Sequence, residues 1–493
     1  MSATLLFSLV IAYFLVLLAV AWVTSRNSNN DSFFIGNRNS NWMLVAFGMI
    51  GTSLSGVTFV SVPGTVGGSG FAYMQVVIGY FIGYFIVAFI LLPLYYRLHL
   101  TSIYLYLEQR FGLVAYKTGA LFFIISRTLG ATARLYLVIN VLQLFILDNL
   151  HVPFWVTTFV ILLMILLYTF EGGVKTIVFT DTLQTTFMLL GLVVCIVYIT
   201  RSLGFSFGET MSALNAKGFT RIFNPDVNSG GFWLKQILGG AFITVGMTGL
   251  DQEMMQKNIS VKNLGDSQKN MVSFSIVLVL VNFLFLLLGG LLYLFAESKQ
   301  IGIKGDDLFP TVALSYLPPV ISFVFIIGLI SALFPSADGA LTALTSSFCI
   351  DLLGLKKRED LDEKGKTKTR RSVHLTFTVV FFLCVMIFKW IDNKSIIDII
   401  LKIAGYTYGP LLGLFAFGIF SKKVVRQGYA VLIVCVAAPV ICYILSDNAA
   451  RWFNGFQIGI ELLILNALIT ILGLSIISSE PPKKERKKRL PQN

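Results

Sequence analysis

The stretch that decides the fold is VSFSIVLVLVNFLFLLLGGLLYLF, residues Val272–Phe295, which contains no charged side chain. About 20 apolar residues in a helix span the ~30 Å hydrocarbon core of a bilayer. Four further runs approach or exceed that length, at Leu5–Val23, Leu121–Ile146, Phe154–Tyr168 and Val373–Phe388. Charged residues make up 13% of the chain, about half their share in soluble domains. The sequence therefore predicts an all-α polytopic membrane protein.

Hydropathy and helix breakers predict about thirteen membrane-spanning helices. Their expected ranges are 4–24, 42–70, 72–97, 118–148, 152–170, 178–204, 231–251, 270–296, 311–350, 372–391, 395–420, 427–446 and 455–478. The second and ninth are too long for one straight span, and each holds a cluster of breaker residues, at Gly51–Gly56 and at Phe334–Gly339. Irregular backbone at membrane depth is tolerated only where it is buried in protein or lines a cavity. We therefore expect both segments to be broken beside a polar site.

The net charge of +13 is explained by where the basic residues lie. Most Lys and Arg residues fall in one alternating set of the predicted loops and in the tail at 481–493. Positive charge marks the cytoplasmic side of a membrane protein. We expect the N-terminus outside and the C-terminus in the cytoplasm, in a cell membrane, with the lipid bilayer rather than a nucleic acid as partner. The five cysteines lie inside apolar runs without metal-ligand spacing, so they predict no metal site.

Ionisable side chains at membrane depth are costly and are functional candidates by default. Asp181 and Asp338 both fall inside predicted spans. Arg127 and Arg134 are seven residues apart, so both project from one face of a helix. A structural ion pair, or a guanidinium that reaches toward a head group, explains each Arg equally well. For Asp181 the alternative is proximity to a water interface. These residues alone indicate a transporter with a polar site near the membrane midplane.

Three ordered blocks resemble the sodium:solute symporter family over nearly the whole chain. Gly172–Gln184 opens with Gly-Gly and closes with Thr-Asp-x-x-Gln, Gly249–Lys257 holds Asp-Gln and Gln-Lys, and Gly405–Phe415 ends in Tyr-Gly-Pro-Leu-Leu-Gly-Leu-Phe. The family includes bacterial proline, galactose and sialic-acid symporters and mammalian sodium–glucose cotransporters. The resemblance implies a transporter and not an enzyme, and the sequence has no His-Glu-x-x-His or Gly-x-Ser-x-Gly motif.

The resemblance also implies the leucine-transporter architecture, with two inverted five-helix repeats and broken first and sixth core helices or their equivalents. The breaker clusters of this sequence fall in the first and the eighth core helices instead. The implied divisions are a leading helix and loop at 1–41, repeats at 42–204 and 231–420, an extracytoplasmic loop at 205–230, two trailing helices at 421–480 and a basic tail at 481–493.

In family members the main sodium site lies between the first and eighth core helices. Carried to this sequence, its ligands are the carbonyls of Gly51, Leu54 and Ala332 and the hydroxyl of Ser336. Pro335 stands where the family usually has Ser or Thr, so one expected hydroxyl is missing. That either weakens the site or means that another group substitutes.

A second site, for a cation or a proton, is hypothesised at Asp181 and Asp338, and Asp338 is the natural substitute for the missing hydroxyl. For the solute, the resemblance implies polar contacts from the unwound helix and its neighbours. Either of two arginines would hold a carboxylate through a bidentate bond. The implied solute residues are Ser53, Ser55, Thr58, Gln75, Arg127, Arg134 and Gln252.

The sequence therefore predicts sodium-coupled symport of a small polar solute, by preference one with a carboxylate, by a functional monomer. Sodium is the only metal implied. Two alternatives stay open: proton coupling through Asp181 or Asp338, and a membrane sensor with a symporter-like domain. The identity of the solute stays open as well, because the family's substrates span sugars, amino acids, carboxylates, vitamins and inorganic anions.

Overall fold

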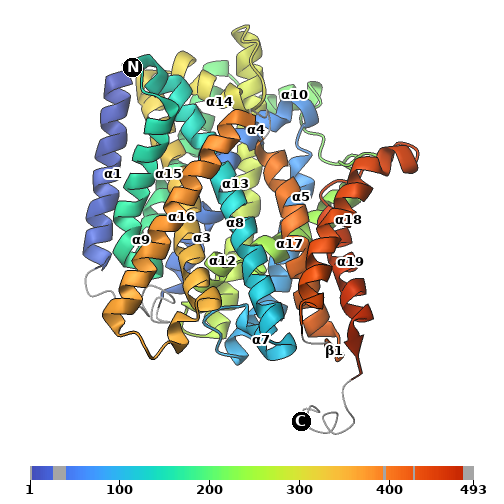
Figure 1. The fold of residues 1–493 in the computed structure, drawn as a ribbon. Helices are drawn as coiled ribbons and strands as arrows, with labels where there is room; N and C mark the ends of the chain where they lie inside the picture. The colour runs from blue at the N-terminus through green and yellow to red at the C-terminus, as the bar shows by residue number, and fades with distance from the viewer. Residues whose placement is uncertain (1–2, 26–39, 392–395, 426–427, 481–493) are drawn as a thin grey trace.

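The helices of the structure run up and down one bundle (Figure 1). This computed structural model describes residues 3–25, 40–391, 396–425 and 428–480, so the predicted tail at 481–493 lies outside it. The α-helices are α1 (Ala3–Ser25), α3 (Trp42–Ser53), α4 (Gly56–Ser69), α5 (Tyr73–Ile86), α6 (Leu92–Arg97), α7 (Leu105–Phe111), α8 (Leu113–Leu142), α9 (Phe154–Leu203), α10 (Phe207–Ala216), α11 (Trp233–Thr244), α12 (Gln252–Ile259), α13 (Leu264–Ser298), α14 (Leu308–Thr311), α15 (Pro319–Ser347), α16 (Glu363–Ile391), α17 (Ile396–Phe420), α18 (Ala430–Trp452) and α19 (Leu462–Ile476). Two short strands, β1 (Val424–Val425) and β2 (Ser478–Ser479), pair antiparallel.

Eight helices in the described ranges are long and apolar enough to cross a membrane, or nine if one bent pair counts as a single span. Three shorter apolar helices lie at Val10–Thr24, Phe154–Phe170 and Leu462–Ile476. The spans predicted at 152–170 and 178–204 both fall within α9, which is continuous through residues 171–175. The chain is thus a mostly helical, multi-pass membrane protein, and the count of thirteen spans stays a prediction.

The break predicted in the second span is present. Helices α3 and α4 are bent by 55° at Leu54 and Ser55. The amide of Leu54 still donates to Ile50 O at 2.8 Å, whereas its backbone has left the helical region. The amide of Gly51 donates to Thr185 Oγ1 on α9 at 3.1 Å, which anchors the end of α3. The Gly-Thr-Ser-Leu-Ser-Gly cluster therefore ends one half-helix and begins the next.

The break predicted at Phe334–Gly339 is wrong. These residues continue through α15, which holds Pro335 in its interior. A proline removes one donor to the carbonyl four residues earlier, and neighbouring groups can compensate for that loss in a packed membrane helix. The Ser336 hydroxyl donates to Leu333 O at 2.9 Å within the same turn. The ninth segment is interrupted upstream instead, where Leu317 and Pro318 separate α15 from the preceding π-helical turn.

A second broken span lies at Leu250 and Asp251, which the sequence did not reveal. Here α11 passes through a π-helical turn, η5 (Val245–Gly249), and the chain restarts as α12. The Asp251 carboxylate caps α12 by accepting the amides of Glu253 at 2.9 Å and Met254 at 3.2 Å. Such a cap satisfies donors that a helix start leaves unpaired. Helices α3–α4 and α11–α12 are thus both interrupted, as the leucine-transporter architecture implies.

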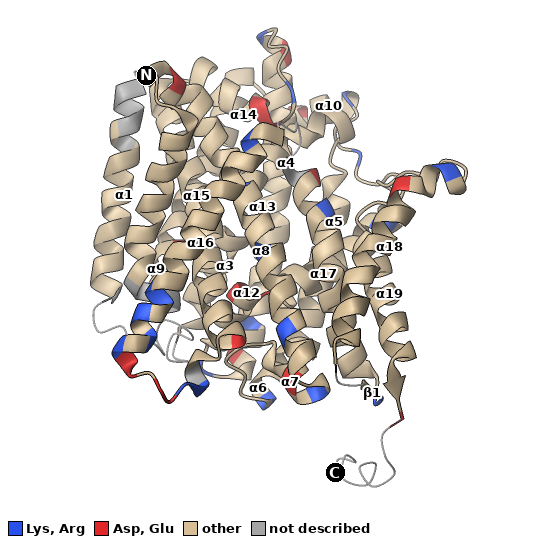
Figure 2. Ribbon diagram, in the orientation of Figure 1, with Lys and Arg blue, Asp and Glu red and all other residues tan. Residues whose placement is uncertain are grey.

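Close packing fixes these halves against the long helices. Helix α15 packs on α9 and α8, α3 packs on α9, and α11 packs on α5. At the last contact, a side chain on Gly79 would place its Cβ 2.9 Å from Gly240 Cα, so the two backbones meet directly. The chain starts α1 at one end of the bundle and reaches β1 and β2 at the other (Figure 1). Lys and Arg residues gather at that second end, near α6, α7 and β1 (Figure 2).

Candidate functional site

A polar cavity of about 100 Å³ lies where α3 and α4 break. Ser53, Ser55 and Thr58 line it, as predicted for solute contacts. The rest of the lining comes from α5, α8, α11, η5, α12, α13 and α17. It adds the side chains of Tyr73, Tyr80, Tyr84, Thr244, Thr248 and Asn282, which sequence reasoning did not select. A cavity lined by hydroxyls and an amide on an apolar frame suits a small polar molecule.

Two predicted solute residues lie elsewhere. Gln75 lines a different cavity. Its amide nitrogen donates to Ala72 O, and its oxygen accepts the backbone amide of Asn224 at 3.2 Å. Gln252 is turned away from the polar cavity and joins α12 to the loop before α7. Its oxygen accepts the Ile103 amide at 3.0 Å and its nitrogen donates to Thr101 O at 3.1 Å. Both amides are satisfied by backbone groups, so neither side chain lines the polar cavity.

The two arginines of α8 both line the cavity but differ in their partners. Arg127 is buried and paired with Glu253, and its second nitrogen lies 3.8 Å from Asp251 Oδ2. Tyr408 on α17 donates to the same Asp251 oxygen at 3.0 Å. Arg134 is half-buried, and it has no hydrogen bond or ion pair among the described residues. Arg127 is therefore neutralised within the protein, and Arg134 presents an uncompensated positive charge to the cavity.

The predicted sodium ligands lie on two packed elements. Gly51 and Leu54 are at the end of α3, and Ala332, Pro335 and Ser336 are in α15, which contacts α3. All five residues are buried. Carbonyls at the end of a helix lack intrahelical donors, which makes them available as hard-oxygen ligands. Helix α3 thus contacts the helix that holds the other three predicted ligands, and the Ala332 carbonyl lies within that continuous helix rather than at a break.

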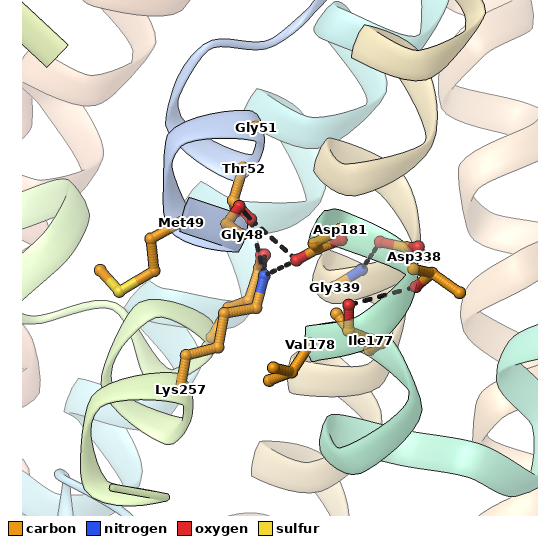
Figure 3. A network of polar contacts seen from close by, with 12 residues as sticks. Gly48, Met49, Gly51, Thr52, Ile177, Val178, Asp181, Lys257, Asp338 and Gly339 are labelled. Atoms are coloured by element: carbon orange, nitrogen blue, oxygen red, sulfur yellow. Dashed lines mark hydrogen bonds and ion pairs between the residues drawn. The ribbon is translucent and has the colours of Figure 1, made fainter. Parts of the chain in front are cut away.

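A buried ion-pair network lies beside this interface (Figure 3). Lys257 on α12 is 3% exposed, and its Nζ lies 2.7 Å from Asp181 Oδ2 on α9. The same Nζ donates to Thr52 Oγ1 at 2.7 Å and to Glu253 Oε1 at 3.3 Å. Thr52 in turn donates to Asp181 Oδ2 at 3.1 Å. Since Glu253 also pairs with Arg127, an unbroken chain of charges runs from α9 through α12 to α8.

Asp338 approaches this network from α15. Its carboxylate accepts the Tyr168 hydroxyl at 2.7 Å and the amide of Gly339. Figure 3 shows it on the side of Asp181 away from Lys257. The two predicted acids are thus in one site, but each has partners within the protein. Oδ1 of Asp181 is buried and has no hydrogen-bond partner among the described residues.

Sequence reasoning missed Lys257 and Glu253. The spans predicted at 231–251 and 270–296 left Lys257 in the loop between them, because the apolar segment before it ends near Leu250. The available signal was the spacing of Glu253 and Lys257, which are four residues apart and pair on one helix face. The restart of the chain as α12 returns both charges to the protein interior.

Two interrupted helices around a buried polar cavity define the class of protein. Broken helices of this kind supply backbone ligands to ions and solutes in secondary transporters. Comparison with known proteins gives the same class. The family model described as "Sodium:solute symporter family" matches residues 33–434. The chain therefore belongs to the sodium:solute symporter family.

Individual relatives are similar over most of their length. The sodium/sialic acid symporter NanT of Aliivibrio fischeri is 22% identical over 477 residues, which cover 93% of this chain and 91% of the relative. The sodium/glucose cotransporter 1 of Oryctolagus cuniculus is 22% identical over 460 residues, which cover 85% and 69%. A solved sodium-coupled sialic acid symporter in a substrate-bound outward-open state superposes with a TM-score of 0.82. That match covers 97% of this chain and 99% of the other at 18% identity.

Family membership gives the activity in general terms. The protein is a sodium-coupled solute symporter of a multi-pass membrane type and not an enzyme, and sodium is the coupling ion. This finding favours sodium over the two alternatives, proton coupling and a sensor role. It leaves the solute open, because the relatives differ in the solutes for which they are named.

Proposed function

We propose that the protein takes up a small carboxylate-bearing solute together with sodium. The observation that carries this proposal is Arg134, which lines the polar cavity and has no acidic partner among the described residues. A charged group within a membrane domain normally pairs or marks a substrate path. A carboxylate would supply the missing partner through two parallel hydrogen bonds. Arg127, by contrast, already has Glu253.

The cavity lining supports a small anion with further polar groups. Ser53, Ser55 and Thr58 line the cavity from the broken helix, and tyrosines of α5 line it as well. The volume of about 100 Å³ favours a compact solute. Two of the similar proteins are named for sialic acid, which is itself a carboxylate. Sialic acid and smaller carboxylates are therefore the first solutes to test.

Sodium coupling has a direct structural basis in this proposal. We assign sodium to the carbonyls of Gly51, Leu54 and Ala332 and to the Ser336 hydroxyl, with Pro335 contributing no hydroxyl. Leu54 also lines the solute cavity, between Ser53 and Ser55. One unwound segment would then hold the ion on one side and the solute on the other. Ordering that segment by sodium would favour solute binding, and by linkage the solute would favour sodium.

The remaining organisation is proposed as the family implies it. We infer inverted repeats at 42–204 and 231–420, alternating access around the cavity, and a functional monomer in the cytoplasmic membrane. The basic end of the bundle (Figure 2) supports a cytoplasmic location for β1 and β2, with the start of α1 outside.

A thermal-shift screen of the purified protein tests the proposal. The probes are sialic acid, lactate and glucose, each with sodium chloride or choline chloride. We expect at least one carboxylate to raise the melting temperature in sodium alone, because a ligand that binds only the folded state stabilises it. A shift produced by glucose and by neither carboxylate would contradict the anionic solute. Equal shifts in choline would contradict sodium coupling.

A further inference from the structure

The ammonium group of Lys257 has the surroundings of a bound cation. Three oxygens from three different elements surround it: Thr52 Oγ1 on α3 at 2.7 Å, Asp181 Oδ2 on α9 at 2.7 Å and Glu253 Oε1 on α12 at 3.3 Å. The side chain is 3% exposed, and Asp181 and Glu253 are at most 2% exposed. A hydroxyl and two carboxylates in a buried pocket are the oxygen donors that a hard cation prefers.

The pocket lies where a coupling ion would act. Thr52 is directly beside Gly51, to which we assign sodium, and it also lines the solute cavity. Lys257 joins the end of α3 to α12, so one positive charge holds together parts of both interrupted helices (Figure 3). Asp181 is the acid predicted to bind a second cation, and Lys257 now occupies its Oδ2. Lysine suits this role because its ammonium is a compact point charge with three donors on a flexible stem.

The position of Asp338 does not change the interpretation of Lys257 as the cation of this pocket. Its two oxygens take the Tyr168 hydroxyl and the Gly339 amide, and Figure 3 shows it beyond Asp181. It therefore has its own partners, whereas Asp181 depends on Lys257 and Thr52. Without Lys257, a fully buried carboxylate would keep only one hydroxyl donor among the described residues. An uncompensated buried charge is strongly unfavourable and recruits a counterion or a proton.

We propose that the ammonium group of Lys257 acts as a tethered cation at Asp181. This inference rests on the sodium site of the proposed function. The ammonium takes the place of a second sodium ion, and the carrier therefore binds one sodium ion per transport cycle. Replacing Lys257 with a neutral side chain of similar length frees the pocket formed by Thr52, Asp181 and Glu253. Sodium then enters that pocket, and the number of bound ions rises from one to two.

Equilibrium binding of ²²Na⁺ to the purified full-length protein tests this proposal. The variants are Lys257→Met, Lys257→Arg as the charge-conserving rescue, and Lys257→Met combined with Asp181→Asn. We expect about one ion for the wild type, about two for Lys257→Met, and about one for the other two. Ser336→Ala identifies the sites, because it should weaken the ion bound by the wild type and spare the ion gained by Lys257→Met.

Each outcome decides between the possibilities. One ion in the wild type and still one in folded Lys257→Met would overturn the tethered-cation proposal and make Lys257 a structural ion pair. Two ions in the wild type would overturn it without any variant, so the proposal stays testable even where Lys257→Met does not fold. No bound sodium in the wild type would refute the sodium site of the proposed function instead, and with it the inference built on that site.

Discussion

Replacement of Arg134 by Gln removes the charge that we assign to the solute carboxylate. A hydrogen bond to a charged group contributes about 1.5–3 kcal/mol. Since 1.4 kcal/mol is a tenfold change in affinity, the Kd of the carboxylate should rise about 10- to 150-fold. Arg134 is half-buried and has no acidic partner among the described residues, so its loss leaves no buried carboxylate unpaired. Calorimetric titration with the carboxylate selected by the thermal screen, in sodium chloride, measures the change.

Two matched variants on the same helix separate binding from stability. Arg134→Lys keeps the charge but loses the planar pair of donors, so its Kd should lie between those of the wild type and Arg134→Gln. Arg127→Gln leaves Glu253 with Lys257 as its one remaining partner among the described residues, and breaking a buried pair costs about 3–5 kcal/mol of stability. It should therefore lower the melting temperature of the ligand-free protein, which Arg134→Gln should not. An unchanged Kd in Arg134→Gln would refute the carboxylate assignment.

Two further predictions concern α15. Pro335→Ser restores the hydroxyl usual in the family and should tighten sodium binding about two- to tenfold, because it adds one contact about as strong as a hydrogen bond. Titration with ²²Na⁺ measures the change in affinity, and weaker binding would contradict the proposed cage. Gly339→Ala should lower the free energy of unfolding by about 1–3 kcal/mol. The new Cβ would lie 2.6 Å from the Glu253 carboxylate carbon, and two ion pairs hold the Glu253 side chain in place. Denaturation in detergent measures that loss, and an unchanged midpoint would show that Glu253 yields freely.

Some parts of this organisation could be predicted from the sequence because they depend on local chemistry. The cluster from Gly51 to Gly56 cannot continue a helix easily, and the structure breaks there by 55°. The two arginines are seven residues apart and both line the cavity. In both cases spacing along one helix determines the outcome.

Other parts depend on contacts between distant segments, which spacing does not reveal. Pro335 was expected to break its helix, but α15 is packed against α9 and α8 and stays continuous. Gln252 was expected in the cavity, but the backbone near Ile103 satisfies its amide. Lys257 was counted as a loop charge, but the chain turns back at Asp251 and buries it beside Asp181. Each of these three differences between prediction and structure arises from a contact with a residue more than 75 positions away in the sequence, or from a new helix that begins after a break.

Solute accumulation in proteoliposomes tests the central claim, sodium-coupled symport, most directly. Vesicles containing the purified protein receive the radiolabelled carboxylate from the thermal screen under an inward sodium gradient at equal pH, or under an inward proton gradient without sodium. We predict accumulation above the external concentration with the sodium gradient only, and its loss when a sodium ionophore dissipates that gradient. Accumulation driven by the proton gradient in sodium-free buffer would contradict the account.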